Sequence, residues 1–110
     1  MRIETVRDAG DGLVADVARL LPQLSPGRFP PTRDELSALL AQSGVELIAA
    51  LDEGRVLGML TLVVYRIPSG VKARIEAVVV DESARGRGVG ELLTREAMRR
   101  AVAAGARRVS

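Results

Sequence analysis

The sequence predicts a single mixed α/β domain of the α+β type, in which helices flank a mostly antiparallel sheet. Its 110 residues fit one domain that spans the whole of 1–110. The hydrophobic fraction of 47% is that of a globular core, whereas aromatic residues make up only 2%, so the core must be aliphatic. Strand-like and helix-like apolar patterns follow one another in the order β-α-α-β-β-β-α-(β).

The N-terminal part predicts a strand and a helix. Residues 2–7 mix β-branched and charged side chains, which is typical of a short strand. Asp11 is the expected N-cap of a helix whose apolar residues recur at helical spacing, and Pro22 is expected to end this helix. Residues 25–31 contain three prolines and a glycine and therefore predict a loop.

The middle of the chain predicts a second helix followed by three strands. Thr32, with Glu35 three residues later, has the pattern of a capping box, which marks the start of a helix. The apolar runs 45–51 and 56–65 are joined by a tight turn and predict a β-hairpin. Residues 73–80 predict the next strand, and their Val-rich end is typical of a strand buried on both faces.

The last quarter predicts a loop, a helix and the opening of another strand. Residues 81–90 are rich in Gly and Arg, and residues 89–104 carry apolar side chains at helical spacing. Gly105 is expected to end the helix, and residues 107–109 resemble a strand start. Residues 83–110 hold seven Arg and two Glu, a net charge of +5, so the first 82 residues carry −3. This asymmetry favours an anionic partner.

The composition excludes several classes of catalyst. The chain has no Cys and no His, which excludes disulfides, thiolate nucleophiles, Ser-His-Asp triads and zinc sites built on these residues, so we expect no metal. Proton transfer must then use Asp, Glu, Lys, Tyr, the backbone or water. The longest apolar stretch, 56–65, is too short to cross a bilayer and no secretory signal is visible, so a cytoplasmic protein is expected.

The most informative segment runs from Val78 to Gly90, where a strand leads into a glycine-rich turn and then into a helix. Backbone N–H groups of such a turn form an anion site, and glycines allow a phosphate to approach closely. Arg85 and Arg87 would add charge-assisted hydrogen bonds. The spacing differs from the Rossmann fingerprint and from a Walker A loop, which leaves a pyrophosphate cradle of another type. The alternative is a surface loop whose glycines serve only a tight turn.

This loop resembles the acetyl-CoA-binding motif of the GNAT superfamily of N-acetyltransferases, Gln/Arg-x-x-Gly-x-Gly/Ala. Arg85, Gly88 and Gly90 occupy its three defined positions. The predicted hairpin with its Gly58 and the order of the elements also resemble those of the family. The resemblance implies acetyl-CoA as the cosubstrate. It implies that backbone groups bind this molecule, along the pantetheine arm at Val78, Val79 and Val80 and at the pyrophosphate at Arg85, Gly86, Arg87, Gly88, Val89 and Gly90.

The resemblance also implies a mechanism. An acceptor amine would attack the thioester directly, without a covalent enzyme intermediate, and a backbone N–H near Val78 would stabilise the oxyanion. Glu76 lies where many members of the family carry a base or a water-ordering carboxylate; a solvated or ion-paired strand residue is the alternative. Tyr65 is a second candidate, for orienting the substrate. Arg28 and Phe29 lie in the loop that covers the acceptor site in this family.

A full domain of the family continues past the motif helix, whereas this sequence ends where the next strand would start. Three hypotheses remain open. The chain is an N-acetyltransferase acting on a small-molecule or peptide amine, a truncated or degenerate module that binds CoA or a partner without catalysis, or a nucleic-acid-binding domain. The −3 charge of the first 82 residues and the scarcity of aromatic residues oppose the third, so no nucleic acid and no membrane is expected as a partner. The unfinished sheet edge leaves a homodimer or strand pairing open.

Overall fold

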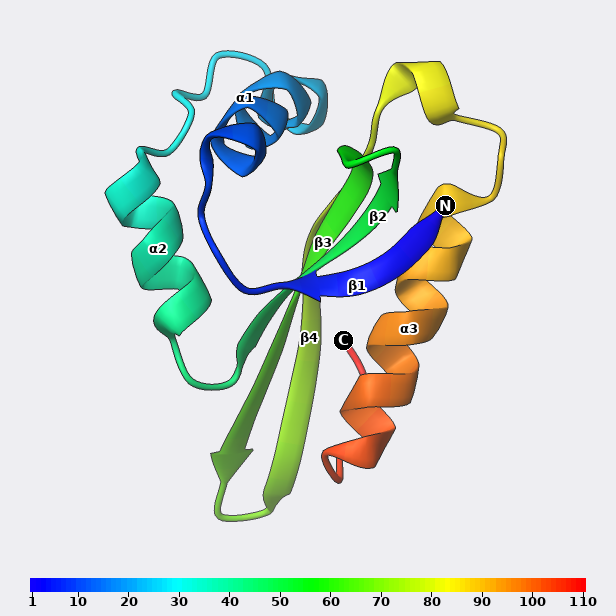
Figure 1. Ribbon diagram of the computed structural model, residues 1–110. Helices are drawn as coiled ribbons and strands as arrows, with labels where there is room; N and C mark the ends of the chain where they lie inside the picture. Colours follow the sequence, from blue (N-terminus) through cyan, green and yellow to red (C-terminus); the bar gives the residue numbers. More distant parts are fainter.

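The computed structural model describes all 110 residues and has a four-stranded antiparallel sheet with helices on both faces (Figure 1). The strands lie side by side in chain order and are β1 (Arg2–Val6), β2 (Val45–Asp52), β3 (Arg55–Ile67) and β4 (Gly70–Val80). One face is covered by α1 (Asp11–Leu24) and α2 (Arg33–Ala41). The other face is covered by α3 (Val89–Ala103), which follows a 3₁₀ turn, η1 (Glu82–Ala84). The predicted fold class and order of elements are confirmed.

Two apolar layers hold the helices against the sheet. The layer under α3 includes Leu93 and the layer under α1 and α2 includes Leu20, and both side chains are fully buried. Burying a side chain of this kind contributes about 1.5–3 kcal/mol. The two aromatic side chains lie outside both layers, since Phe29 is 93% and Tyr65 41% exposed. The core is therefore aliphatic, as the composition predicted.

The starts of the two N-terminal helices differ in how they are capped. Thr32 Oγ1 accepts a hydrogen bond from the backbone N–H of Glu35, and Glu35 Oε1 accepts one from the backbone N–H of Thr32, so the predicted capping box is confirmed. At α1 the N-cap is Gly10 instead of the expected Asp11, which is the first helical residue. The Asp11 carboxylate lies near the positive end of the helix and pairs with Arg33.

Pro22 does not end α1, which continues to Leu24. Proline removes one backbone hydrogen bond and weakens the last turn. The turn persists because the Gln23 side chain forms two hydrogen bonds. Its Nε2 donates to the backbone O of Arg19 in the same helix at 3.3 Å and to Asp81 Oδ1 after β4 at 3.0 Å. Side-chain contacts with a distant segment thus extend the helix beyond the proline.

Strand β4 forms one edge of the sheet. The expectation that its end is buried on both faces is wrong for Val78, which is 39% exposed because no further element covers this edge. Lower on β4, Ser110 N donates to Ala73 O at 3.0 Å, and Ile75 N donates to Ser110 O at 2.8 Å. Val109 forms a parallel bridge with Ala73, which confirms the predicted strand opening after α3. No helix combines the length and apolar character needed to cross a membrane.

Candidate active site

The loop of residues 85–90 connects η1 with α3 beyond the end of β4. Gly86 and Gly88 adopt the left-handed conformation, with φ of 81° and 78°. No hydrogen bond within the protein uses the backbone N–H groups of residues 86–91. Six successive donors, three of them in the first turn of α3, are therefore left for a ligand, and the helix dipole favours an anion there.

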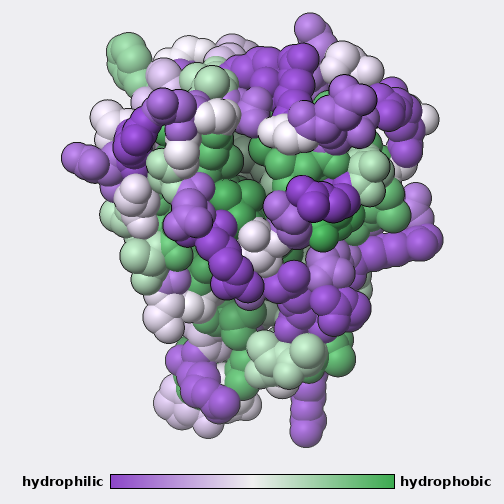
Figure 2. Space-filling model, in the orientation of Figure 1, coloured by the Kyte–Doolittle hydropathy of each residue, from purple (hydrophilic) through white to green (hydrophobic).

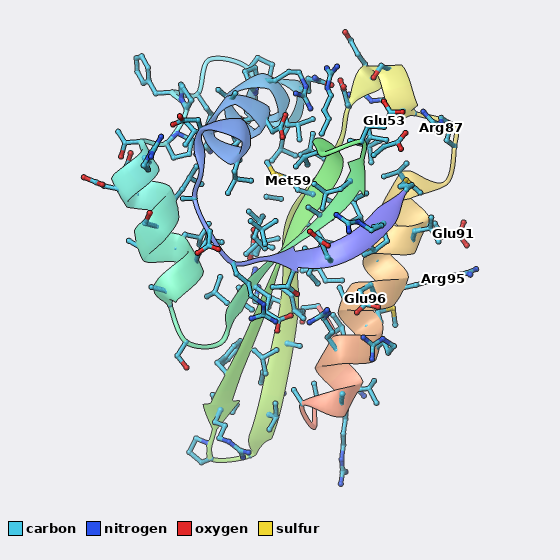
Figure 3. All side chains as sticks on the ribbon, in the orientation of Figure 1. Glu53, Met59, Arg87, Glu91, Arg95 and Glu96 are labelled. Carbon is cyan, nitrogen blue, oxygen red and sulfur yellow. The ribbon has the colours of Figure 1, made fainter.

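The side chains of this loop contribute in different ways. Arg85 Nε donates to Val80 O at 3.2 Å, which ties the loop back to the end of β4. Arg87 lies on the loop and is exposed (Figure 3). Val89 is 2% exposed and packs in the core, so only its backbone can bind a ligand. A Cβ on Gly90 would lie 3.5 Å from Val80 Cγ2, an ordinary contact.

Buried Asp81 fixes the start of the loop. Gln23 Nε2 donates to its Oδ1 at 3.0 Å, and Ser83 Oγ donates to its Oδ2 at 2.9 Å. The guanidinium groups of Arg19 and Arg55 each lie 3.6 Å from Oδ2. The Gln23 hydrogen bond above all, together with Ser83 and the two arginines, holds the pKa of Asp81 below its ordinary value of 3.8, although burial opposes this. Asp81 is therefore ionised at neutral pH.

The same contacts join α1 to the loop and to the β2–β3 hairpin. Gln23 Oε1 accepts a hydrogen bond of 2.8 Å from the backbone N–H of Glu82 in η1. Asp16 Oδ1 pairs with Arg19 at 2.7 Å, and Asp16 Oδ2 accepts a hydrogen bond of 3.2 Å from the N–H of Val56. None of these residues was singled out from the sequence, because 58 positions separate Gln23 from Asp81 and no local pattern marks the pair.

A bulge interrupts the pairing of β3 with β4 close to the candidate site. The register runs from Met59↔Val79 to Thr61↔Glu76, so two residues of β4, Ala77 and Val78, lie opposite one residue of β3. Ala77 has φ of 54°, a conformation that costs a non-glycine residue free energy. The ladder is therefore open beside Val78, the residue near which an oxyanion donor was expected.

The two candidate catalytic side chains lie on the same face of the sheet but apart. Glu76 is exposed, lies opposite Thr61 and pairs with Arg74, with 3.2 Å between Nε and Oε1. Tyr65 lies opposite Lys72, four residues further along β3 than Thr61, a distance of about 13 Å along a strand. The structure thus brings Glu76 to the bulge and leaves Tyr65 towards the far end of the hairpin.

An apolar cavity of about 150 Å³ lies beside the bulge, between the sheet and the first two helices. Met59, which lines it, is seen between α1 and the sheet in Figure 3. The cavity is lined by Val17, Leu21, Pro31, Leu36, Leu39, Leu47, Met59, Thr61 and Ala77. No local sequence pattern marks this set, because its members come from six separate segments.

Two larger cavities lie at the opposite edge of the sheet, beside β1. They measure about 590 and 550 Å³ and share Thr5, Val6, Arg7 and Arg100. Figure 2 shows hydrophobic areas on this side of the molecule, surrounded by projecting polar side chains. Neither cavity is lined by the 85–90 loop or by Glu76, so the size of a cavity does not identify the candidate active site. No group of three or more acidic side chains is arranged to hold a metal ion.

Comparison with known proteins decides the family. The sequence profile of the Acetyltransferase (GNAT) family matches residues 15–110, which include the loop, the bulge, α2, α3 and most of α1. The chain belongs to the GNAT family of acetyltransferases. This family uses acetyl-CoA as the acetyl donor, and the chain is accordingly an acetyltransferase. No curated protein matches the chain in sequence.

Solved structures of GNAT proteins share the fold. A protein from Agrobacterium tumefaciens str. C58 described as an acetyltransferase is 27% identical, with a TM-score of 0.85 over 100% of this chain and 79% of its own. The aminoglycoside acetyltransferase meta-AAC0020, from an uncultured soil metagenomic sample and in complex with sisomicin, is 23% identical, with a TM-score of 0.84 over 99% and 74%. AAC(6')-Iy, in complex with a CoA bisubstrate analogue, is 20% identical, with a TM-score of 0.74 over 99% and 76%.

Proposed function

We propose that this GNAT protein transfers an acetyl group from acetyl-CoA to a primary amine by direct attack on the thioester. The observation that carries the proposal is the run of six unused backbone N–H groups at residues 86–91. Such a run is a cradle for a diphosphate, the anionic part of CoA. Gly86 and Gly88 hold the cradle in a left-handed conformation that other residues rarely adopt. The donor set therefore fits the cosubstrate that the family uses.

Three features of the chain prepare this cradle before a ligand arrives. Asp81 and Gln23 fix the preceding 3₁₀ turn, and Arg85 anchors the loop to Val80 O. A Cβ on Gly58 would lie 3.0 Å from Val89 Cγ1, so α3 packs very closely on β3 at its first turn. A loop that is already ordered loses little conformational entropy on binding, which favours affinity.

The residues of β4 provide the groups that acetyl transfer needs. Acetyl-CoA supplies a thioester: a C–N bond forms at its carbonyl carbon, the C–S bond breaks, and CoA leaves as the thiol with a proton from the amine. Glu76 accepts a proton from the incoming ammonium, which frees the nitrogen lone pair. A backbone N–H of the bulge, at Ala77 or Val78, stabilises the negative oxygen, because the bulge frees one ladder donor.

The proposal is tested first by binding and then by turnover. Acetyl-CoA at a hundred times its Kd stabilises a protein by about 2.7 kcal/mol, so the melting temperature should rise by roughly 10 °C. Release of the CoA thiol is then measured with a panel of primary amines. The absence of both a thermal shift and thiol release would refute the proposal. A thermal shift without turnover on any amine would instead support a CoA-binding module without catalysis.

A further inference from the structure

We infer that the acceptor is a monoamine that carries a compact apolar group, which binds in the cavity of about 150 Å³ beside the bulge of β4. The inference rests on the proposed acetyl transfer and names the substrate class for it. Seven of the nine residues that line the cavity are hydrophobic. Two of the nine, Thr61 and Ala77, belong to the paired strands at the bulge and so link the cavity to the proposed chemistry.

The size of the cavity limits the apolar group. A dry apolar cavity of about 150 Å³ in another protein holds one benzene molecule. A branched chain of four or five carbons, or a single phenyl ring, therefore fills the space, whereas a sugar ring would leave its hydroxyl groups without hydrogen-bond partners. Leu36 is 3% exposed and Met59 is 6% exposed, so a group that packs against them is shielded from water on that side.

The charges beside the cavity admit one ammonium group. Glu76 lies directly opposite Thr61 and next to Ala77, so its carboxylate stands beside two residues that line the cavity. The next residues of β4 on the same face are Arg74 and Lys72, both exposed. A second ammonium on the acceptor would meet these cations, which disfavours polyamines and aminoglycosides relative to monoamines.

The apolar group in the cavity belongs to the acceptor and not to the acyl donor, because the Glu76 carboxylate, which would take the proton of the acceptor amine, lies beside the cavity. An acetyl group has one methyl and leaves most of 150 Å³ empty. The loop of residues 25–31 contributes Pro31 to the lining and carries Phe29, which is almost fully solvent-exposed. The cavity is thus bordered by a loop that lies away from the phosphate cradle (Figure 1), which leaves that side for a second substrate.

The first experiment compares amines of equal basicity with acetyl-CoA as the donor. Each buried methylene improves binding about fourfold, so the three extra carbons of 3-methylbutylamine should raise kcat/KM roughly 50-fold over ethylamine. Spermidine should be a poorer acceptor than 3-methylbutylamine. A ratio near one for the two monoamines, or a preference for spermidine, overturns the inference while leaving acetyl transfer intact.

A pair of variants on α2 tests the cavity itself. Leu39→Phe places a larger side chain in the lining and should reduce the preference for 3-methylbutylamine at least tenfold, with ethylamine turnover retained. Leu40→Phe is the matched control, because Leu40 has similar burial but lines the cavity of about 550 Å³ beside β1. An equal loss of preference in both variants overturns the assignment of the cavity.

Two further measurements separate the remaining outcomes. If butyryl-CoA is preferred over acetyl-CoA and Leu39→Phe removes that preference, the cavity holds the acyl group and the inference is wrong. If no amine is acetylated, ligand-observed NMR still compares binding of 3-methylbutylamine and ethylamine to the unmodified chain. Selective binding of the larger amine that Leu39→Phe abolishes supports the inference even though the proposed function has failed; equal or absent binding overturns it.

Discussion

Replacing Asp81 with Ala removes the carboxylate that organises the start of the phosphate cradle. The variant loses the hydrogen bonds from Gln23 and Ser83 and the 3.6 Å ion pair with Arg19, which then keeps only Asp16 as an ion-pair partner. Removing one member of a buried ion pair costs about 3–5 kcal/mol. For a chain of 110 residues, an unfolding entropy of about 2.1 cal/mol/K per residue converts 1 kcal/mol into roughly 4 °C. The melting temperature should therefore fall by roughly 12–20 °C.

Thermal unfolding followed by circular dichroism at 222 nm measures this change. Glu91→Ala is the control, because the Glu91–Arg95 pair projects from α3 into solvent and both side chains are mostly exposed (Figure 3). Losing such a pair costs at most about 0.5 kcal/mol, or roughly 2 °C. A fall of less than 4 °C for Asp81→Ala would show that the buried network does not hold the loop.

The pH dependence of the same difference identifies the carboxylate as its source. The pKa of Asp81 is lowered in the folded chain, so its contribution is fully present above the ordinary value of 3.8. It is lost as pH falls below 3.8 through the lowered folded value. The gap in melting temperature between the unmodified chain and Asp81→Ala should stay constant from pH 5 to 8 and narrow below pH 4. A gap that is unchanged at pH 3 would rule out an ionic origin.

Three other substitutions separate binding, catalysis and packing. Gly88→Val places a β-branched residue at φ of 78° and should weaken acetyl-CoA binding, measured by calorimetry, at least tenfold. Unchanged affinity would show that the pyrophosphate does not bind at Gly88. Glu76→Gln should lower kcat about 10²–10⁴-fold and leave the Kd for acetyl-CoA unchanged, and an unaltered kcat would remove Glu76 as the base. Gly58→Val overpacks the contact with Val89 and should cost about 1–3 kcal/mol of stability, whereas a neutral effect would mean that α3 can shift.

Features with a local cause were predictable from the sequence. The capping box of Thr32 and Glu35 involves residues three positions apart, and both hydrogen bonds form. The β2–β3 turn is predictable because Gly54 accepts a left-handed conformation, here with φ of 78°. The position of the glycine-rich loop between strand and helix is predictable for the same reason. In each case, conformational preferences within a few residues decide the structure.

Features that depend on distant residues were not predictable in the same way. Pro22 is a strong signal for a helix end, but contacts of Gln23 with Asp81 outweigh it. The bulge at Ala77 leaves no mark in the sequence, because alanine has no preference for φ of 54° and the strand continues on both sides. The apolar cavity likewise exists only once α1, α2 and the sheet have assembled.

The exclusion of aromatic rings from the core also determines what spectroscopy can see. The chain has one Tyr and no Trp, so Tyr65 is the only residue with strong intrinsic fluorescence. It lies on the sheet face that carries Glu76, four residues from Thr61 along β3. Its emission therefore reports on the part of the β3–β4 hairpin where Tyr65 lies opposite Lys72, while circular dichroism reports on the whole fold. Coincidence of the two unfolding curves would show that this hairpin unfolds together with the aliphatic core.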